Sequence, residues 1–181
     1  KYLKVLGPSR FAENRKRIRE TGLKDFRYYA IKEMNRHISD YDIWLADHKL
    51  SEKDLKKQRE HRFAYEPKIS IVIPLYNTPL DFLKALIDSV QSQTYRNWQL
   101  CLADGSNNGQ VGPFIQRMYG KEKRISYVLL EKNDGISENT NGAIRIADGD
   151  FIMFSDHDDT LAPNALYEIV KAVNEDLETD V

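Results

Sequence analysis

The sequence predicts an α/β protein in which a mostly parallel sheet is flanked by helices and preceded by a helical N-terminal extension. Strand-like apolar runs alternate with helical patterns four times after residue 67. Each run ends in polar or turn-forming residues, as expected where parallel strands end together at one edge of a sheet. With 181 residues, 41% of them hydrophobic, the chain can form one domain with a core and an appendage.

Residues 1–66 are predicted to form a separate helical unit. They hold 17 Lys and Arg against 11 Asp and Glu, whereas residues 67–181 hold 10 against 17. This basic balance favours a solvated helix face, and peripheral association with an anionic membrane stays open as an alternative. A capping-box pattern at residues 51–54 predicts a charged helix that runs to about His61.

An apolar stripe predicts an earlier helix over about residues 24–48. The stripe is expected to pack against a neighbouring helix or the following domain, and a homo-oligomer interface is the alternative. Its members recur at spacings of three and four residues: Phe26, Ala30, Met34, His37, Tyr41 and Trp44.

The second unit, residues 67–181, is predicted to alternate strand and helix. Its first strand is too apolar to face water, which is typical of a parallel strand covered on both sides. Cys101 stands in an apolar setting that predicts a buried strand, and a single cysteine excludes a disulfide framework. The expected strands are residues 69–75, 98–103, 125–130 and 150–155, and the expected helices are 81–90, 111–119, 137–147 and one that begins near Pro163.

Polar residues follow all four predicted strands. They are residues 74–77, 104–106, 133–135 and 156–159, and together they would line the binding crevice of an open α/β sheet. The last segment, Asp-His-Asp-Asp, crowds three carboxylates into four positions. Such carboxylates repel one another unless a cation, hydrogen-bond donors or water relieves them. The sequence therefore predicts a cation and an anionic ligand at this edge.

Several classes of protein are excluded. No G-x-G-x-x-G follows the first strand and no P-loop pattern occurs, so a dinucleotide fold or a P-loop nucleotidase loses its main support. No stretch of about 20 apolar residues could span a membrane. No nucleic-acid partner is expected. Because the chain begins at Lys1 without a signal-peptide pattern and stops where an element begins, we expect a piece of a longer protein.

Five segments stand in a distinctive order: residues 71–77, 89–95, 103–106, 135–137 with Asn141, and 156–159. This series resembles the motif series of family 2 glycosyltransferases over residues 67 to about 170. The variant with Gly-Ile-Ser and Asp-His-Asp-Asp is similar to bacterial enzymes that build O-antigen, rhamnan and other cell-surface polysaccharides. Residues 1–66 match only loosely, as a helical leader.

The resemblance implies a GT-A, Rossmann-like fold of the nucleotide-diphospho-sugar transferase type, of which residues 67–181 would be the nucleotide-sugar-binding half. It implies a nucleotide-sugar donor, most plausibly a UDP- or dTDP-sugar, and a divalent cation, Mn²⁺ or Mg²⁺. Transfer would invert the anomeric carbon in a single displacement onto a glycan or lipid-linked glycan acceptor. The location implied is the cytoplasm or the inner face of the cell membrane.

The resemblance also assigns roles to residues of the first two strand ends. Pro74 and the ring of Tyr76 would line the nucleoside pocket, with Asn77 in the same turn. Asp104 would accept a hydrogen bond from the base. The family usually has two aspartates where this chain has Ala103 and Asp104, so one carboxylate near the ribose is missing.

At the fourth strand end, Asp156 and Asp158 match the two acids of the family's D-x-D motif. Asp158 would be the direct metal ligand, and the metal would stabilise the departing nucleoside diphosphate. His157 is not expected to be a ligand. The catalytic base is unknown and is expected beyond Val181, so the chain is predicted to bind donor and metal without transferring sugar.

Ordinary structural roles compete with these assignments. For Asp159 we favour capping of the helix near Pro163, because acids are preferred at helix N-termini. Tyr76 could be a core ring, and residues 104–106 are also ordinary turn residues. Asn77 is expected to hold its turn, and Asn141 to hold loop backbone by hydrogen bonds.

Two other functions remain open at this stage. A metal-dependent nucleotidyltransferase would need basic residues near the first strand, and none occurs between Pro74 and Asp81. A catalytically inactive nucleotide-binding or scaffold module, in which the helical leader recruits a partner, is the third hypothesis.

Overall fold

The computed structural model describes residues 15–16, 18–20, 22 and 40–176. The chain divides into two compact units, Lys1–Ser51 and Glu52–Val181. In the first unit, helix α3 spans Asp40–His48 and exposes Tyr41 and Trp44 to solvent. These two rings belong to the predicted apolar stripe, and the rest of that stripe lies outside the described residues.

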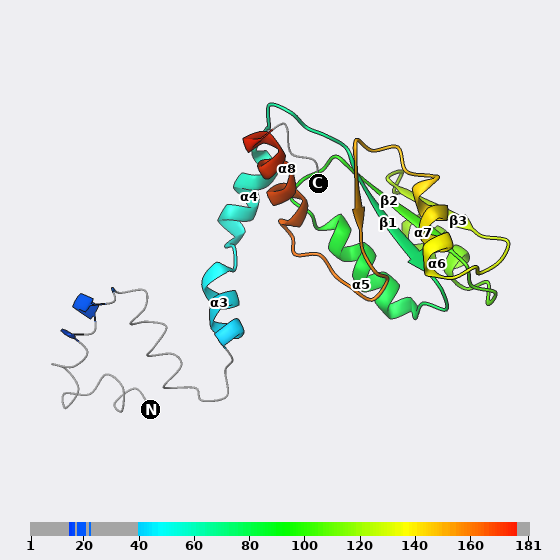
Figure 1. Cartoon of the computed structure of the whole chain (residues 1–181), viewed down its shortest axis with the longest axis horizontal. Helices are drawn as coiled ribbons and strands as arrows, with labels where there is room; N and C mark the ends of the chain where they lie inside the picture. The colour runs from blue at the N-terminus through cyan, green and yellow to red at the C-terminus, as the bar shows by residue number, and fades with distance from the viewer. Residues whose placement is uncertain (1–14, 17, 21, 23–39, 177–181) are drawn as a thin grey trace. The chain divides into compact units, whose positions relative to one another are not determined.

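The second unit contains the parallel sheet that the sequence predicts (Figure 1). The strands lie in the order β3-β2-β1-β4, and every pairing between neighbours is parallel. The strands are β1 Ile69–Leu75, β2 Trp98–Asp104, β3 Ile125–Leu129 and β4 Phe151–Phe154, and the helices are α4 Glu52–Glu60, α5 Leu80–Gln91, α6 Val111–Tyr119, α7 Ile136–Ile144 and α8 Ala165–Glu175.

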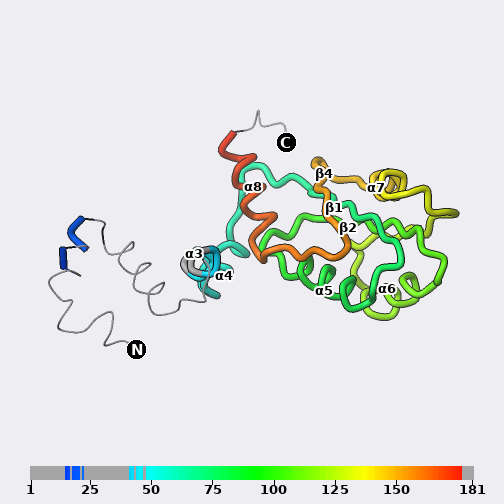
Figure 2. The backbone as a smooth tube through the Cα atoms, turned by 60° about the horizontal axis from the view of Figure 1, so that its bottom comes forward, coloured from blue at the N-terminus to red at the C-terminus, as the bar shows by residue number. Residues whose placement is uncertain are grey.

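Helices cover both faces of the two central strands, which are buried along their whole length. Figure 2 shows α7 on one side of β1 and β2, and α5 and α6 on the other. Alternate residues of β1 therefore enter different cores, because successive side chains of a strand point to opposite faces. Ile71 and Ile73 pack with residues of α5, α6 and α8, whereas Val72 packs with Cys101 and the residues of α7.

Helix α4 belongs to the sheet unit, although the sequence grouped it with the N-terminal extension. The division between units falls after Ser51 and not at residue 66. The Gln58 side chain accepts a hydrogen bond from the Thr94 hydroxyl at 3.0 Å and donates one to Glu168 at 3.3 Å. Phe63 then packs between the rings of Tyr95 and Tyr167.

Gln93, two residues after the end of helix α5, holds the far end of the loop that follows β4. The Gln93 side chain is fully buried. Its amide nitrogen donates to the carbonyl of Ala162 at 2.7 Å, and its amide oxygen accepts the N–H of Leu166 at 3.0 Å. Two more hydrogen bonds hold this loop. The Ser89 hydroxyl accepts the N–H of Leu161, and the Thr94 N–H donates to the carbonyl of Pro163.

Replacing Gln93 with Leu should therefore destabilise the protein at nearly constant side-chain volume. The change leaves the Leu166 N–H and the Ala162 carbonyl without these partners, at a combined cost of about 2–4 kcal/mol. Urea unfolding would measure this loss as a lower midpoint at an unchanged slope. The control is Gln116→Leu on the exposed side of α6, which should change stability by less than about 0.5 kcal/mol. Equal midpoints for the two variants would contradict the assigned role.

Candidate functional site

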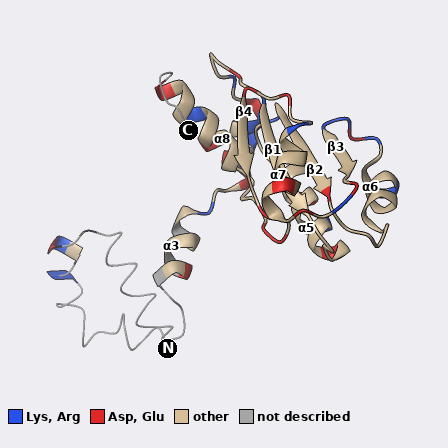
Figure 3. Cartoon of the chain, turned by 45° about the vertical axis from the view of Figure 1, so that its right-hand side comes forward, with Lys and Arg blue, Asp and Glu red and all other residues tan. Residues whose placement is uncertain are grey.

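The carboxyl ends of the strands meet at one edge of the sheet and enclose a cleft. In the register of the sheet, Leu75 pairs with Asp104, and the Ser155 N–H reaches the carbonyl of Val72 at 3.4 Å. Figure 3 shows acidic residues at the end of β2 and in the loop after β4. The cleft has a volume of about 470 Å³ and is lined by Pro74, Leu75, Tyr76, Asn133, Gly135, Ile136, Asn139, Asp156, His157 and Asp158.

Four of the six predicted site residues line this cleft, namely Pro74, Tyr76, Asp156 and Asp158. Tyr76 is 50% exposed, so its ring is not part of the core. The ring is therefore free to contact a ligand.

Asn77 holds the turn after β1 and does not line the cleft. Its φ of 49° lies in the left-handed region, which asparagine tolerates better than most residues. The Asn77 N–H donates to the Ser106 hydroxyl at 2.7 Å, which joins the turns after β1 and β2. The turn-forming role expected for Asn77 is confirmed.

Asp104 lies at the end of β2 and is only 1% exposed. One carboxylate oxygen accepts the N–H of Ser106 at 2.9 Å, and the other accepts the hydroxyl of Tyr127 at 3.0 Å. Burial, together with this bond, raises the pKa of the Tyr127 hydroxyl. Each carboxylate oxygen can accept a second hydrogen bond, so reading of a base by Asp104 stays a prediction.

The three aspartates after β4 do not all line the same hollow. Asp156 and Asp158 are exposed and line the cleft, with His157 between them. Asp159 instead borders a smaller hollow of about 230 Å³, which also reaches Asp156. The capping role expected for Asp159 is wrong, because α8 begins only at Ala165 and has Asn164 at its N-cap position.

The described residues contain no group of three or more His, Cys, Asp or Glu side chains placed to hold a metal ion. Two carboxylates in one cleft still provide the hard oxygen ligands that Mg²⁺ and Mn²⁺ prefer. A cation in this cleft would therefore complete its coordination with oxygens of a ligand or of water.

The turn before α7, which the sequence placed at this edge, lines the cleft, and α7 itself adds Ile136 and Asn139, which the sequence did not assign to the site. Asn133 forms a turn, its amide oxygen accepting the N–H of Gly135 at 3.2 Å. The same oxygen accepts the side-chain amide of Asn139 at 2.9 Å. Asn141, which was expected to hold loop backbone, donates its amide to the Glu138 side chain on the same helix instead. The Asn-x-Gly pattern marks the Asn133 turn in the sequence, but nothing there marks the burial of Asn139.

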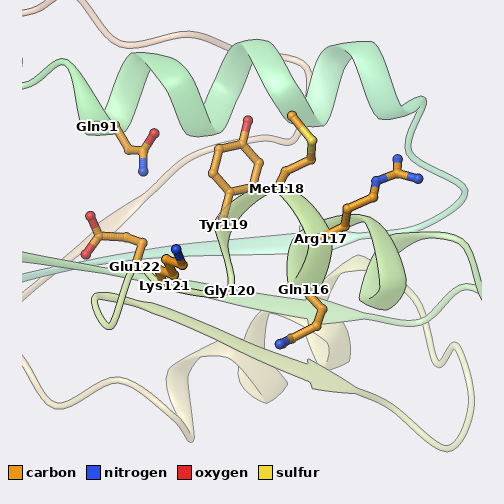
Figure 4. A pocket seen from close by; sticks show the side chains of 8 residues that line it. All are labelled: Gln91, Gln116, Arg117, Met118, Tyr119, Gly120, Lys121 and Glu122. Atoms are coloured by element: carbon orange, nitrogen blue, oxygen red, sulfur yellow. The ribbon is translucent and has the colours of Figure 1, made fainter.

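A second hollow of about 680 Å³ lies at the end of α6 (Figure 4). None of the predicted site residues lines it. The Tyr119 hydroxyl in its wall donates to Asp88 at 2.9 Å, and burial followed by this bond raises the pKa of Tyr119 to about 12. This hollow therefore lies apart from the cleft at the strand ends.

Comparison with known protein families gives one match, the Glycosyl transferase family 2 model, over residues 70–181. The chain belongs to glycosyl transferase family 2. The five ordered motifs thus identified the family correctly. Two proteins similar to the chain are the uncharacterized protein y4gI of Sinorhizobium fredii, at 40% identity over 62% of this chain, and the O-antigen biosynthesis protein RfbC of Myxococcus xanthus, at 27% identity over 75% of this chain.

Solved glycosyltransferase structures share the fold. Staphylococcus aureus TarS in complex with UDP-GlcNAc matches 60% of this chain and 31% of its own, with a TM-score of 0.55 and 23% identity. The mannosyltransferase PcManGT of Pyrobaculum calidifontis, in complex with GDP-Man and Mn²⁺, matches 67% of this chain and 38% of its own, with a TM-score of 0.55 and 18% identity. The predicted GT-A fold is confirmed.

This family 2 chain spans only 12% of the length of y4gI and 11% of the length of RfbC. Within the part of the chain that the structure describes, no helix is both long enough and apolar enough to cross a membrane.

The bond between Tyr127 and Asp104 predicts a dependence of stability on pH. The pKa of Tyr127 is raised in the folded state, so its stabilising contribution is complete below pH 10, where the unfolded side chain begins to ionise. That contribution is lost as the pH rises further. Tyr127→Phe should therefore lose stability less steeply above pH 10 than the unchanged protein, as measured by urea midpoints at pH 8, 10 and 11. Parallel declines would show that Tyr127 does not titrate in this way.

Proposed function

We propose that the sheet unit is the donor-binding part of an inverting glycosyltransferase that takes a nucleotide-sugar and a divalent cation, Mn²⁺ or Mg²⁺. The observation that carries this proposal is the single cleft shared by Pro74, Tyr76, Asp156 and Asp158. The cleft places the exposed ring of Tyr76 near the exposed carboxylates of Asp156 and Asp158. The base of a nucleoside diphosphate could contact the ring, and a cation held by the carboxylates could bind its phosphates.

The carboxylates of Asp156 and Asp158 would bind the cation, with Asp158 as the direct ligand. When bound, the cation would neutralise charge on the departing nucleoside diphosphate. The cleft itself is poor in positive charge, because none of its described lining residues is Lys or Arg. Phosphate groups would therefore need a counter-charge that the side chains do not supply. This need also counts against a nucleotidyltransferase, whose triphosphate carries still more charge.

The nucleoside would lie against the half-exposed ring of Tyr76 and the backbone at Pro74. The bond from Asn77 to Ser106 keeps this turn beside the end of β2. Asp104, next to Ser106, would use its remaining acceptor capacity for the base. UDP- and dTDP-sugars are the proposed donors, and the structure of TarS with UDP-GlcNAc supports a uridine nucleotide.

The rest of the proposal concerns the protein as a whole. The acceptor is a glycan or lipid-linked glycan, in keeping with relatives such as the O-antigen biosynthesis protein RfbC. The cation is supported by PcManGT, whose structure contains Mn²⁺. A base must also remove the proton of the acceptor hydroxyl in a single displacement.

The cation-dependent binding of UDP tests this function directly. UDP with Mn²⁺, at about 100-fold above Kd, should raise the melting temperature of the chain by roughly 5–10 °C. Asp158→Asn should abolish most of this shift, because it removes the charge that holds the cation. Differential scanning calorimetry with UDP or dTDP, each with Mn²⁺ or EDTA, would measure it.

The matched control is Asp159→Asn, which removes a neighbouring carboxylate that does not line the cleft. This variant should keep the shift. If Asp158→Asn and the unchanged chain respond equally, the proposed cation site is wrong.

A further inference from the structure

The side-chain amide of Asn139 carries an unsatisfied hydrogen-bond acceptor beside the cleft. Asn139 is 2% exposed, and its amide oxygen has no hydrogen-bond partner in the structure. Buried polar atoms almost always have a partner, so an orphaned acceptor at a cleft calls for an explanation. A bound ligand could supply the missing N–H or O–H donor.

The surrounding bonds determine which atom of the amide is the free one. The backbone N–H of Gly135 can only donate, so the Asn133 atom that faces it at 3.2 Å must be the amide oxygen. That same oxygen faces the Asn139 side chain at 2.9 Å, so Asn139 must present its NH₂ group there. Turning the Asn139 amide over would bring two oxygens together. The free atom is therefore an acceptor, and it needs an N–H or O–H group.

The acceptor lies where helix α7 packs against the turn after β2. Asn139 lines the cleft together with Tyr76 and Asp158. Its amide also lies against Gly105, where an added Cβ would stand 2.7 Å from the amide nitrogen and 3.1 Å from the amide oxygen. Gly105 follows directly after Asp104. The acceptor thus lies next to the turn where the base is proposed to be read.

The chemistry of the acceptor selects one part of a nucleotide-sugar. Phosphate oxygens are themselves acceptors and would repel it. The nucleoside, by contrast, has donors in the N3–H of a uracil or thymine ring and in the hydroxyls of ribose.

We propose that Asn139 binds the nucleoside of the donor by accepting a hydrogen bond from a ribose hydroxyl, since the one N–H of a uracil or thymine base is already assigned to Asp104. This inference rests on the proposed function of the same cleft. Asn139 then acts with Asp104 to select the nucleoside, while Asp156 and Asp158 serve the diphosphate. The hydrogen bond between Asn133 and Asn139 orients the Asn139 amide oxygen, and Gly105, which has no side chain, leaves room for the amide.

Binding of UDP and two analogues by the 181-residue chain tests the inference. Isothermal titration with Mn²⁺ would compare the binding of UDP, 2′-deoxy-UDP and 3′-deoxy-UDP by the unchanged chain and by Asn139→Ala. The unchanged chain should bind UDP about five- to tenfold more tightly than Asn139→Ala does, as expected for one hydrogen bond. It should also discriminate against one of the two deoxy analogues, which identifies the donor as the 2′- or the 3′-hydroxyl. Asn139→Ala should lose that discrimination.

Two further variants separate binding from folding. Asn141→Ala removes an exposed asparagine from the same helix, outside the cleft, and should bind all three nucleotides like the unchanged chain. Gly105→Ala keeps Asn139 but displaces its amide, and should reproduce the loss of discrimination.

The outcomes distinguish the two proposals. If Asn139→Ala binds all three nucleotides as the unchanged chain does, or weakens all three equally, the hydrogen bond to the nucleoside is refuted while the donor site stands. If the unchanged chain binds none of UDP, dTDP and GDP in the presence of Mn²⁺, the proposed function fails and the role of Asn139 fails with it.

Discussion

The structure depends on strand β1, which is paired on both edges and buried on both faces. Its register places Ile69 opposite both Trp98 of β2 and Phe151 of β4. Because all neighbours run parallel, this one register sets the ends of β2 and β4 on either side of the turn after β1. The cleft forms at that turn. A largely β-branched strand with no charged residue suits this central place between two layers of helices.

Side-chain amides and hydroxyls form hydrogen bonds that hold the loops of the cleft. Ser106 joins two turns by accepting the N–H of Asn77, and Asn133 joins the turn before α7 to Asn139. Gln93 fastens the far end of the loop that carries Asp156 and Asp158. Short polar side chains suit this role because they can form hydrogen bonds with loop N–H and C=O groups that have no partner in a β-sheet. The exposed acids are thus carried on a loop that is fixed at both ends.

Most of the fold was predictable, because the apolar runs and helical patterns after residue 67 are strongly periodic. All four strands and the helices between them occur within a few residues of their expected places. The site was predictable in part. Tyr76, Asp156 and Asp158 follow strands directly, so the topology alone brings them to one edge. Asp104 is also at that edge, but the sequence could not show that Tyr127, 23 residues later, takes one of its oxygens.

Three expectations differ from the structure. Asp159 was expected to cap α8, and Asn141 to hold loop backbone, because each residue type often does so locally. The sequence also grouped α4 with the N-terminal extension because of its charge, whereas Gln58 ties that helix to Thr94 and Glu168 in the sheet unit. The placement of α4 depends on contacts between residues far apart in the chain, which no local pattern encodes, whereas Asn141 and the start of α8 differ from expectation within a few residues.

The sequence by itself determined the family, the parallel sheet and the acidic loop after β4, since each follows from periodicity or from motifs in a fixed order. Tertiary structure alone decided which polar groups remain available for a ligand. It buried Asp104 under Tyr127, turned Asp159 away from the cleft, and left one oxygen of Asn139 without a partner. The physical reason is that hydrogen-bond satisfaction depends on all neighbours of a buried atom at once, and those neighbours meet only when the strands and helices pack.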